Sequence, residues 1–141
     1  MARIMGVDLG DVRTGVALSD PFEFMATGLC TITEYSEDRL LEKLAAIAEE
    51  NSVKAAVFGL PVNMDGTEGF RAEKVRAFTE RFAEMTGKAV VLEDERCTTV
   101  AAHSILNESL KKGSKKRKRV IDTLSAEIIL QDYLDRQKKS R

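Results

Sequence analysis

The sequence predicts one α/β domain, in which a mixed sheet of three antiparallel strands followed by parallel strands carries helices on both faces. Its 141 residues are 43% hydrophobic and 32% charged, which suits a single compact domain over residues 1–141. Strand-like and helix-like hydrophobic patterns follow in the order three strands, helix, strand, helix, strand, helix, helix. The later strand–helix–strand unit favours a parallel, right-handed crossover.

Three strands are expected at the start of the chain. Ile4 to Asp8 is a short strand that enters a turn bracketed by Gly10 and Gly15, and residues 16–19 leave that turn as the second strand of a hairpin. β-Branched and aromatic residues from Phe24 to Thr33 predict the third strand. Tight connections between these strands favour antiparallel pairing.

The middle of the chain alternates between helix and strand. Ser36 predicts a helix start, and apolar residues at helical spacing continue to Asn51, namely Leu40, Leu41, Leu44, Ile47 and Ala48. Residues 53–59 form an apolar run of strand length, which ends before Pro61, and Asp65-Gly66 marks a turn.

Three further elements and a basic loop complete the prediction. A helix that ends near Gly87 is indicated by the spacing of Phe70, Phe78, Phe82 and Met85. An apolar strand follows from Ala89 to Leu92, and Thr98 or Thr99 caps a helix that runs to about Leu110. A flexible basic loop at 111–119 then leads to a last helix over Val120 to Leu134.

The composition excludes several classes of protein. Two cysteines, Cys30 and Cys97, and one histidine, His103, cannot supply a structural zinc site or a disulfide framework, and a single histidine disfavours Ser-His-Asp or Cys-His catalysis. No apolar run approaches the roughly 20 residues of a membrane helix, and no secretory signal is present at residue 1. We therefore expect a cytoplasmic protein without membrane contact.

Charge is distributed unevenly along the chain. Residues 111–141 hold 11 Lys and Arg against 4 Asp and Glu, whereas residues 1–110 hold 11 against 19, so the tail carries +7 and the body -8. Seven of the basic residues lie between Lys111 and Arg119. Such a run is attracted to polyanions, and a solvated loop is the alternative interpretation.

Acidic residues stand where strands end. Asp8 ends the first strand on the same face as Ile4 and Gly6, and Gly6 leaves room for a group beside its carboxylate. Glu93-Asp94-Glu95 ends a later strand, where alternation groups Glu93 with Glu95 and does not choose between that face and Asp94. A turn-forming aspartate and a solvated acidic turn are the alternatives.

Asp122 is expected in the first turn of the last helix. Helical spacing aligns it with a largely apolar face made of Ser125, Ala126, Ile129 and Tyr133. A carboxylate on a packing face is costly unless it is paired or binds a metal, although an acid near a helix N-terminus is also favoured by the helix dipole.

These acids could converge, because sites in open α/β sheets form where strands end. Oxygen donors from three carboxylates suit Mg²⁺ or Mn²⁺ rather than zinc. Paired metals about 4 Å apart activate water and stabilise the leaving oxygen in phosphodiester cleavage. A basic segment would then bind the polyanionic substrate.

Four stretches follow one another over nearly the whole chain: Gly6 to Ala17 with Ser19-Asp20, Gly59-Leu60-Pro61 with Asp65-Gly66, Asp94 to Thr99, and Asp122 to Ala126 with Ile129-Leu130 and Tyr133-Leu134. Together they resemble the YqgF-like family of pre-16S ribosomal RNA nucleases and Holliday-junction-resolvase homologues. The resemblance implies an RNase H-like fold. Cys97 departs from the larger apolar residue expected at its position.

The resemblance also implies roles for individual residues. Asp8, Glu95 and Asp122 become the catalytic acids and the ligands of Mg²⁺ or Mn²⁺. Arg13 and Arg96 lie beside two of the acids and are candidate phosphate contacts, with surface salt bridges as the alternative. The basic loop takes the place of a mobile segment near the family's site, and its composition favours nucleic-acid contact through Lys115, Lys116, Arg117, Lys118 and Arg119.

The expected function is a metal-dependent endonuclease that acts on structured RNA and processes the 5′ end of precursor 16S ribosomal RNA. The alternatives are a Holliday-junction resolvase, which predicts a two-fold dimer, and a non-catalytic nucleic-acid-binding module. Expected partners are RNA, with branched DNA and the ribosome as further candidates, for a monomer or weak homodimer. Asp8-Leu9-Gly10 also resembles the phosphate loop of actin-like ATPases, but the chain is too short for their two lobes and lacks a Walker A lysine.

Overall fold

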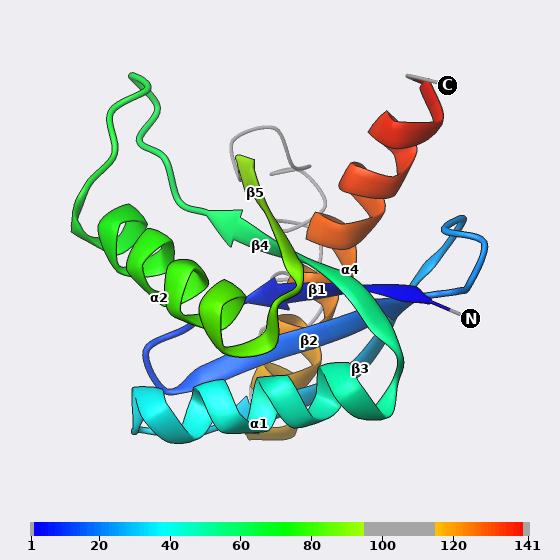
Figure 1. Cartoon of the computed structure of the whole chain (residues 1–141). Helices are drawn as coiled ribbons and strands as arrows, with labels where there is room; N and C mark the ends of the chain where they lie inside the picture. Colours follow the sequence, from blue (N-terminus) through cyan, green and yellow to red (C-terminus); the bar gives the residue numbers. More distant parts are fainter. Residues whose placement is uncertain (1, 95–114, 140–141) are drawn as a thin grey trace.

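The computed structural model describes residues 2–94 and 115–139, with side chains described over 2–94 and 123–138. Its elements are β1 (Arg3–Asp8), β2 (Arg13–Ser19), β3 (Ala26–Thr33), α1 (Glu37–Glu50), β4 (Val53–Leu60), α2 (Phe70–Thr86), β5 (Ala89–Asp94) and α4 (Lys115–Lys139) (Figure 1). Within these ranges no helix is both long and apolar enough to cross a membrane.

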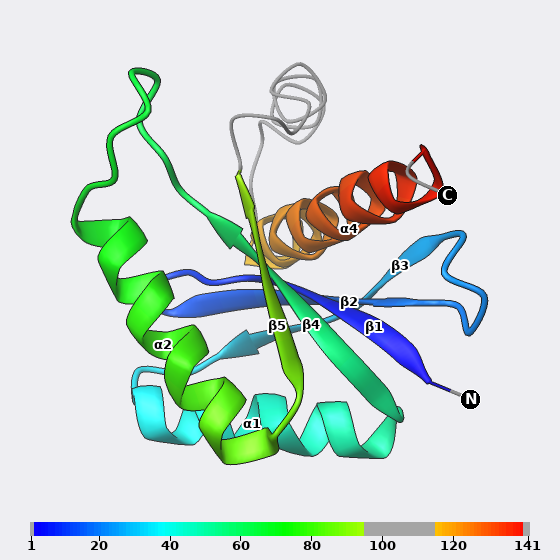
Figure 2. The ribbon, with the colours of Figure 1, turned by 45° about the horizontal axis from the view of Figure 1, so that its top comes forward.

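One sheet organises the domain, with the strand order β3-β2-β1-β4-β5. The pairs β1–β2 and β2–β3 are antiparallel, whereas β1–β4 and β4–β5 are parallel. Figure 2 shows α1 and α2 on one side of the sheet and α4 on the other. The predicted fold class, a mixed sheet with helices on both faces, is confirmed.

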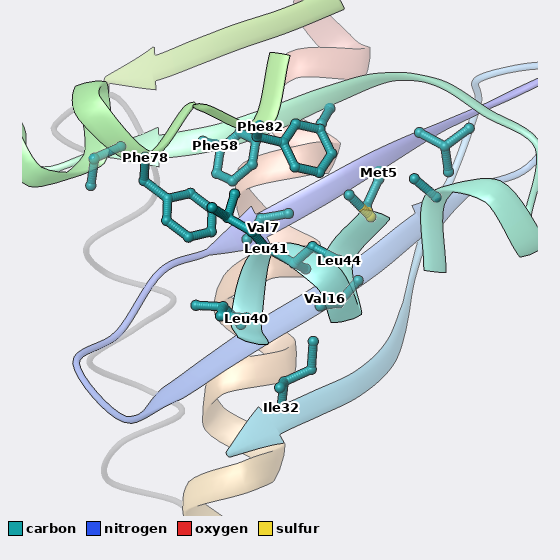
Figure 3. Close-up of a cluster of buried hydrophobic side chains, with 14 of the residues drawn as sticks. Met5, Val7, Val16, Ile32, Leu40, Leu41, Leu44, Phe58, Phe78 and Phe82 are labelled. Atoms are coloured by element: carbon teal, nitrogen blue, oxygen red, sulfur yellow. The ribbon is translucent and has the colours of Figure 1, made fainter. Parts of the chain in front are cut away.

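The larger core lies between the sheet and the helices α1 and α2. Alternation along β1 sends Met5 and Val7 to this side, where they meet buried leucines of α1 (Figure 3). Phe58 of β4 lies at the centre, with its ring edge-on to Phe78 at 6.1 Å and to Phe82 at 5.5 Å between centroids. This cluster fixes α2 over the parallel half of the sheet.

A smaller core lies under α4. Ile4 and Val57 pack there against apolar residues of the helix, namely Ala126, Ile129, Leu130 and Leu134. Gly6 allows the close approach, because a Cβ at this position would stand 2.6 Å from Leu130 Cβ and 2.9 Å from the Ala126 carbonyl oxygen. The room predicted beside Gly6 is therefore occupied by α4 itself, because the missing side chain brings helix and sheet together.

Gly6→Ala is expected to destabilise the fold by about 1–3 kcal/mol, because an added methyl group overpacks this contact. One of its two close neighbours is backbone, which cannot rotate away. Urea unfolding at a fixed temperature measures the loss. Gly69→Ala is the matched control, since its Cβ would meet only one side chain at 3.8 Å, and equal losses in the two variants would contradict the packing explanation.

Several predicted element boundaries are confirmed, with local hydrogen bonds as their cause, but β2 begins at Arg13, inside the predicted turn, and not at Val16. The Arg39 N–H donates to the Ser36 side chain at the start of α1, and Gly87 ends α2 with φ of 70° while its N–H donates to the Ala83 carbonyl. β3 starts at Ala26 rather than Phe24, because the Asp20 carboxylate accepts the N–H groups just before it. The bond from Met25 is the largest cause of the lowered pKa of Asp20.

The start of the last helix is a correction. α4 begins at Lys115 and not at Val120, so Lys115 to Arg119 lie on a helix and not in the predicted loop. Lys and Arg are good helix formers, and this preference outweighs their mutual repulsion here. Asp122 is consequently the eighth residue of α4 rather than a first-turn residue, beyond the reach of the helix dipole. The rest of the loop, 111–114, and the helix predicted over 98–110 lie outside the described residues.

Candidate active site at the carboxyl edge of the sheet

The parallel strands bring their acidic ends to one edge of the sheet. β1, β4 and β5 run in the same direction and end at Asp8, Leu60 and Asp94. The turn from β1 into β2 lies at this edge as well, because β2 is antiparallel to β1. Asp8 and the 93–94 acids therefore share an edge, as the sequence predicts.

Asp8 is flanked by glycine on both neighbouring strands. It pairs directly with Gly15 of β2, and the register of Val7 with Phe58 brings Gly59 of β4 alongside it. Alternation gives Asp8 the same face as Ile4, the face crossed by α4. Neither neighbouring residue has a side chain, and the Asp8 carboxylate is half-buried. Sequence reasoning did not single out these glycines as a pair, because the pairing depends on register.

Glu93 lies in the same row as Asp8 and has a structural role. Glu93 of β5 pairs with Gly59 of β4, which lies beside Asp8 of β1. Glu93 and Asp8 are therefore two strand spacings, about 10 Å, apart. Only 4% of its surface is exposed, and its carboxylate forms an ion pair with Arg136 of α4. The pair offsets the cost of burying the charge and ties the end of β5 to α4. Sequence reasoning missed Arg136, whose spacing of seven residues from Ile129 was the available signal.

Asp94 belongs to the opposite face. Alternation groups it with Leu92, which packs against the α1 and α2 core. Its negative charge acts on Glu68. A hydrogen bond from Arg76 is the main cause of the lowered pKa of Glu68, and the charge of Asp94 opposes that lowering. Glu93 therefore shares the face of Asp8, and Asp94 does not. Glu95 lies outside the described residues.

The residues paired side by side with Asp8 across β2 and β3 end at a contact with α4. Gly15 pairs with Thr31 of β3, and the hydroxyls of Thr31 and Thr123 are hydrogen-bonded with 2.9 Å between the oxygens. Thr123 directly follows Asp122 in the helix, so the helix backbone beside Asp122 crosses the sheet two strands from Asp8. Gly28 assists this approach, because a Cβ there would collide with Thr123.

Several predicted site residues cannot be compared with the structure. Glu95, Arg96, Cys97 and His103 lie outside the described residues, as do the side chains of Asp122 and of the basic residues 115–119. Over side chains 2–94 and 123–138, no group of three or more His, Cys, Asp or Glu could hold a metal. Because Glu95 and Asp122 are not in those ranges, convergence of the three acids stays a prediction.

Arg13 is described and lies at the expected edge. It is the first residue of β2 and is half-buried. Gly10 shapes the turn before it, because a Cβ at Gly10 would collide with the Arg13 carbonyl oxygen. The turn thus holds Arg13 close to the end of β1, and its phosphate-binding role stays a prediction.

A cavity of about 220 Å³ opens at the same edge but over the other face of the sheet. It extends from Asp8, Leu9 and Gly10 to the starts of α1 and α2. Because alternation turns the Asp8 side chain toward α4, only the end of the strand borders the cavity. Residues that the sequence reasoning missed line it, namely Tyr35, Arg71 and Lys74.

This strand order, with an aspartate ending the central strand and a late helix crossing its face, is that of the RNase H-like fold. Residues 2–136 match the family model described as "RuvX: Holliday junction resolvase". The chain belongs to that family, and the YqgF-like identification made from the four motifs is confirmed.

Relatives and a solved structure agree with this assignment. A Streptococcus sanguinis protein named "Putative pre-16S rRNA nuclease" is 47% identical over 136 residues, 95% of this chain and 98% of the relative. A Clostridium kluyveri protein of the same name is 44% identical over 137 residues, 97% and 99% of the two chains. The structure of T. thermophilus RuvC in complex with Holliday junction substrate matches with a TM-score of 0.63 at 11% identity, over 99% and 98% of the two chains, which supports the fold.

Proposed function

We propose that the chain is a metal-dependent endonuclease that hydrolyses phosphodiester bonds in structured RNA and processes the 5′ end of precursor 16S ribosomal RNA in the cytoplasm. The observation that carries the proposal is Asp8, at the end of the central strand, between Gly15 and Gly59, on the face that α4 crosses. The names of the full-length relatives support the choice of substrate.

Asp8, Glu95 and Asp122 are the proposed ligands of Mg²⁺ or Mn²⁺. The described part of the site fits such an ion, because Asp8 offers carboxylate oxygens, the ligands that Mg²⁺ prefers, and has glycine on both neighbouring strands. When bound, the metal would activate water and stabilise the leaving oxygen. Asp8 would hold one charge near the reacting phosphate, and the Glu93–Arg136 ion pair would keep the end of β5 against α4.

The proposed phosphate contacts are Arg13, Arg96 and the basic residues 115–119. Arg13 belongs to the same sheet edge as Asp8, and guanidinium groups bind phosphate through two parallel hydrogen bonds. The basic residues occupy the first turns of α4, where residues three or four apart share a face. RNA, the ribosome and branched DNA are the proposed partners of a monomer or weak homodimer.

The test compares substrates under matched conditions. A precursor 16S ribosomal RNA fragment and a four-way DNA junction are each incubated with the protein in Mg²⁺, Mn²⁺ or EDTA. Metal-dependent RNA cleavage supports the proposal. Cleavage of the junction alone would favour the resolvase activity in the family's description, with a two-fold dimer in solution. Binding of RNA without cleavage of either substrate would instead support a non-catalytic binding module.

Neutralising the basic start of α4 should weaken RNA binding and reduce its salt dependence. Replacing Lys115, Lys116, Arg117, Lys118 and Arg119 with glutamine keeps good helix formers and removes five charges. If each contacts a single-strand phosphate, the slope of log affinity against log salt falls by about 3.5. Lys54→Gln, at the other edge of the sheet, is the control. An unchanged slope in the fivefold variant would remove this segment from the RNA-binding surface.

A further inference from the structure

The cavity beside Asp8 has an apolar floor and two charged walls. Its floor includes Leu40, Pro61, Val75 and Phe78, and its inner border is the turn after β1. One wall comes from the start of α1 and the residues just before it, and the other comes from the first two turns of α2. At about 220 Å³ it is smaller than the roughly 300–1,000 Å³ typical of drug-sized ligands. It therefore suits one unit of a chain better than a whole cofactor.

The acids of the first wall are already paired. Glu34 binds Lys43 Nζ at 2.8 Å, and that hydrogen bond is the main cause of the lowered pKa of Glu34. Glu37 forms an ion pair with Arg81 at 3.1 Å. These two carboxylates are therefore less able to repel an anion in the cavity.

The cations of the second wall remain available. Arg71 and Lys74 form no ion pair with any side chain in 2–94 or 123–138. Lys74 Nζ instead stands 5.4 Å from the ring centroid of Phe70. Arg71 and Lys74 are three residues apart on α2 and so point to the same side of the helix. Two cations that have no ion pair among the described side chains, and that lie on one wall, suit a phosphate.

Exposed aromatic rings accompany these cations. Tyr35 lines the cavity with 83% of its surface exposed, and Phe70, under Lys74, is 72% exposed. Exposed rings beside cations form the combination that stacks and holds unpaired bases. Bases inside a duplex are already stacked, so only a single-stranded segment can use such a ring.

We propose that this cavity binds one unpaired nucleotide of the RNA substrate, with its base against Tyr35 and its phosphate at Arg71 and Lys74. The inference rests on the proposed nuclease function and adds a substrate class, RNA with a single-stranded segment next to the cleavage point. Asp8 to Asp11 border the cavity, so the bound strand crosses the edge of the sheet to reach the face of the Asp8 carboxylate. These contacts position the strand and take no part in the chemical step.

Binding is tested without cleavage, in EDTA, with a short single-stranded RNA that contains 2-aminopurine. Tyr35→Ala should weaken binding about tenfold and remove the fluorescence quenching caused by stacking, whereas Tyr35→Phe should restore both. Replacing Arg71 and Lys74 with glutamine should lower the salt slope by about 1.4. Phe22→Ala and Lys54→Gln are the matched controls, because Phe22 is 65% exposed and both residues lie at the opposite edge.

The outcomes separate this inference from the proposed function. Loss of binding and quenching in the cavity variants, with both controls unchanged, supports the inference even if the wild-type protein cuts no RNA. Wild-type binding and quenching in Tyr35→Ala would overturn it, even if RNA cleavage is confirmed. Equal weakening in the cavity variants and the controls, failure of Tyr35→Phe to restore quenching, or no single-strand binding by the wild-type protein would also overturn it.

Discussion

Asp8→Asn is expected to abolish metal-dependent cleavage while leaving the fold intact. Asparagine has nearly the shape of aspartate but carries no charge, so it fills the space between Gly15 and Gly59 without offering the metal an anionic ligand. Loss of several kcal/mol of transition-state stabilisation corresponds to a rate lowered about 10²- to 10⁴-fold. Cleavage rates at saturating Mg²⁺, with circular dichroism spectra of both proteins, measure the effect.

Asp94→Asn is the matched control for this experiment. Asp94 ends β5 at the same edge but belongs to the face that packs against α1 and α2. Its loss should change the cleavage rate by less than about threefold, because its side chain lies on the face of the sheet opposite Asp8 and α4. Full activity in Asp8→Asn, or equal losses in the two variants, would contradict the assignment of the active face.

Phe58→Ala is expected to lower the free energy of unfolding by about 3–5 kcal/mol. The ring is fully buried and holds two edge-on contacts, with Phe78 and Phe82 of α2. Removing it leaves a cavity under that helix and loses both aromatic contacts. Because domains of this size have about 5–15 kcal/mol of total stability, the variant should lie close to the limit of folding. Denaturant unfolding at 25 °C measures the change.

Phe22→Ala provides the comparison for that measurement. Phe22 lies in the exposed turn between β2 and β3, so its truncation should change stability by no more than about 0.5 kcal/mol. If the two phenylalanine variants unfold at the same denaturant concentration, the three-ring cluster does not hold α2 on the sheet.

The strands and their faces could be predicted because each strand follows one simple alternation. Ile4, Gly6 and Asp8 share the face of α4, while Met5 and Val7 share the other core. Helix ends at Ser36 and Gly87 were equally accessible, since a side-chain cap and a left-handed glycine act through nearby atoms. These features depend only on neighbours in the chain.

Features that depend on register or on distant elements could not be predicted. Gly15 and Gly59 flank Asp8 only because of how β2 and β4 pair with β1, and the Glu93–Arg136 ion pair joins residues of two separate elements. The cavity likewise combines segments around Tyr35 and Lys74 that are distant in sequence. The start of α4 was mispredicted for another reason, because repulsion among basic residues was weighted above their helix propensity.

The order of the elements, with α4 after the strands, has a consequence for biosynthesis. The five strands of the described residues emerge from the ribosome before the helix that covers Ile4, Ala17 and Val57. A nascent chain can therefore close one core early, but it keeps the opposite apolar face open until α4 has been synthesised. A chain released before α4 is made would keep that apolar face exposed to solvent and would lack Asp122. Such fragments would be substrates for chaperones and proteases, and without a proposed metal ligand we expect them not to cleave RNA.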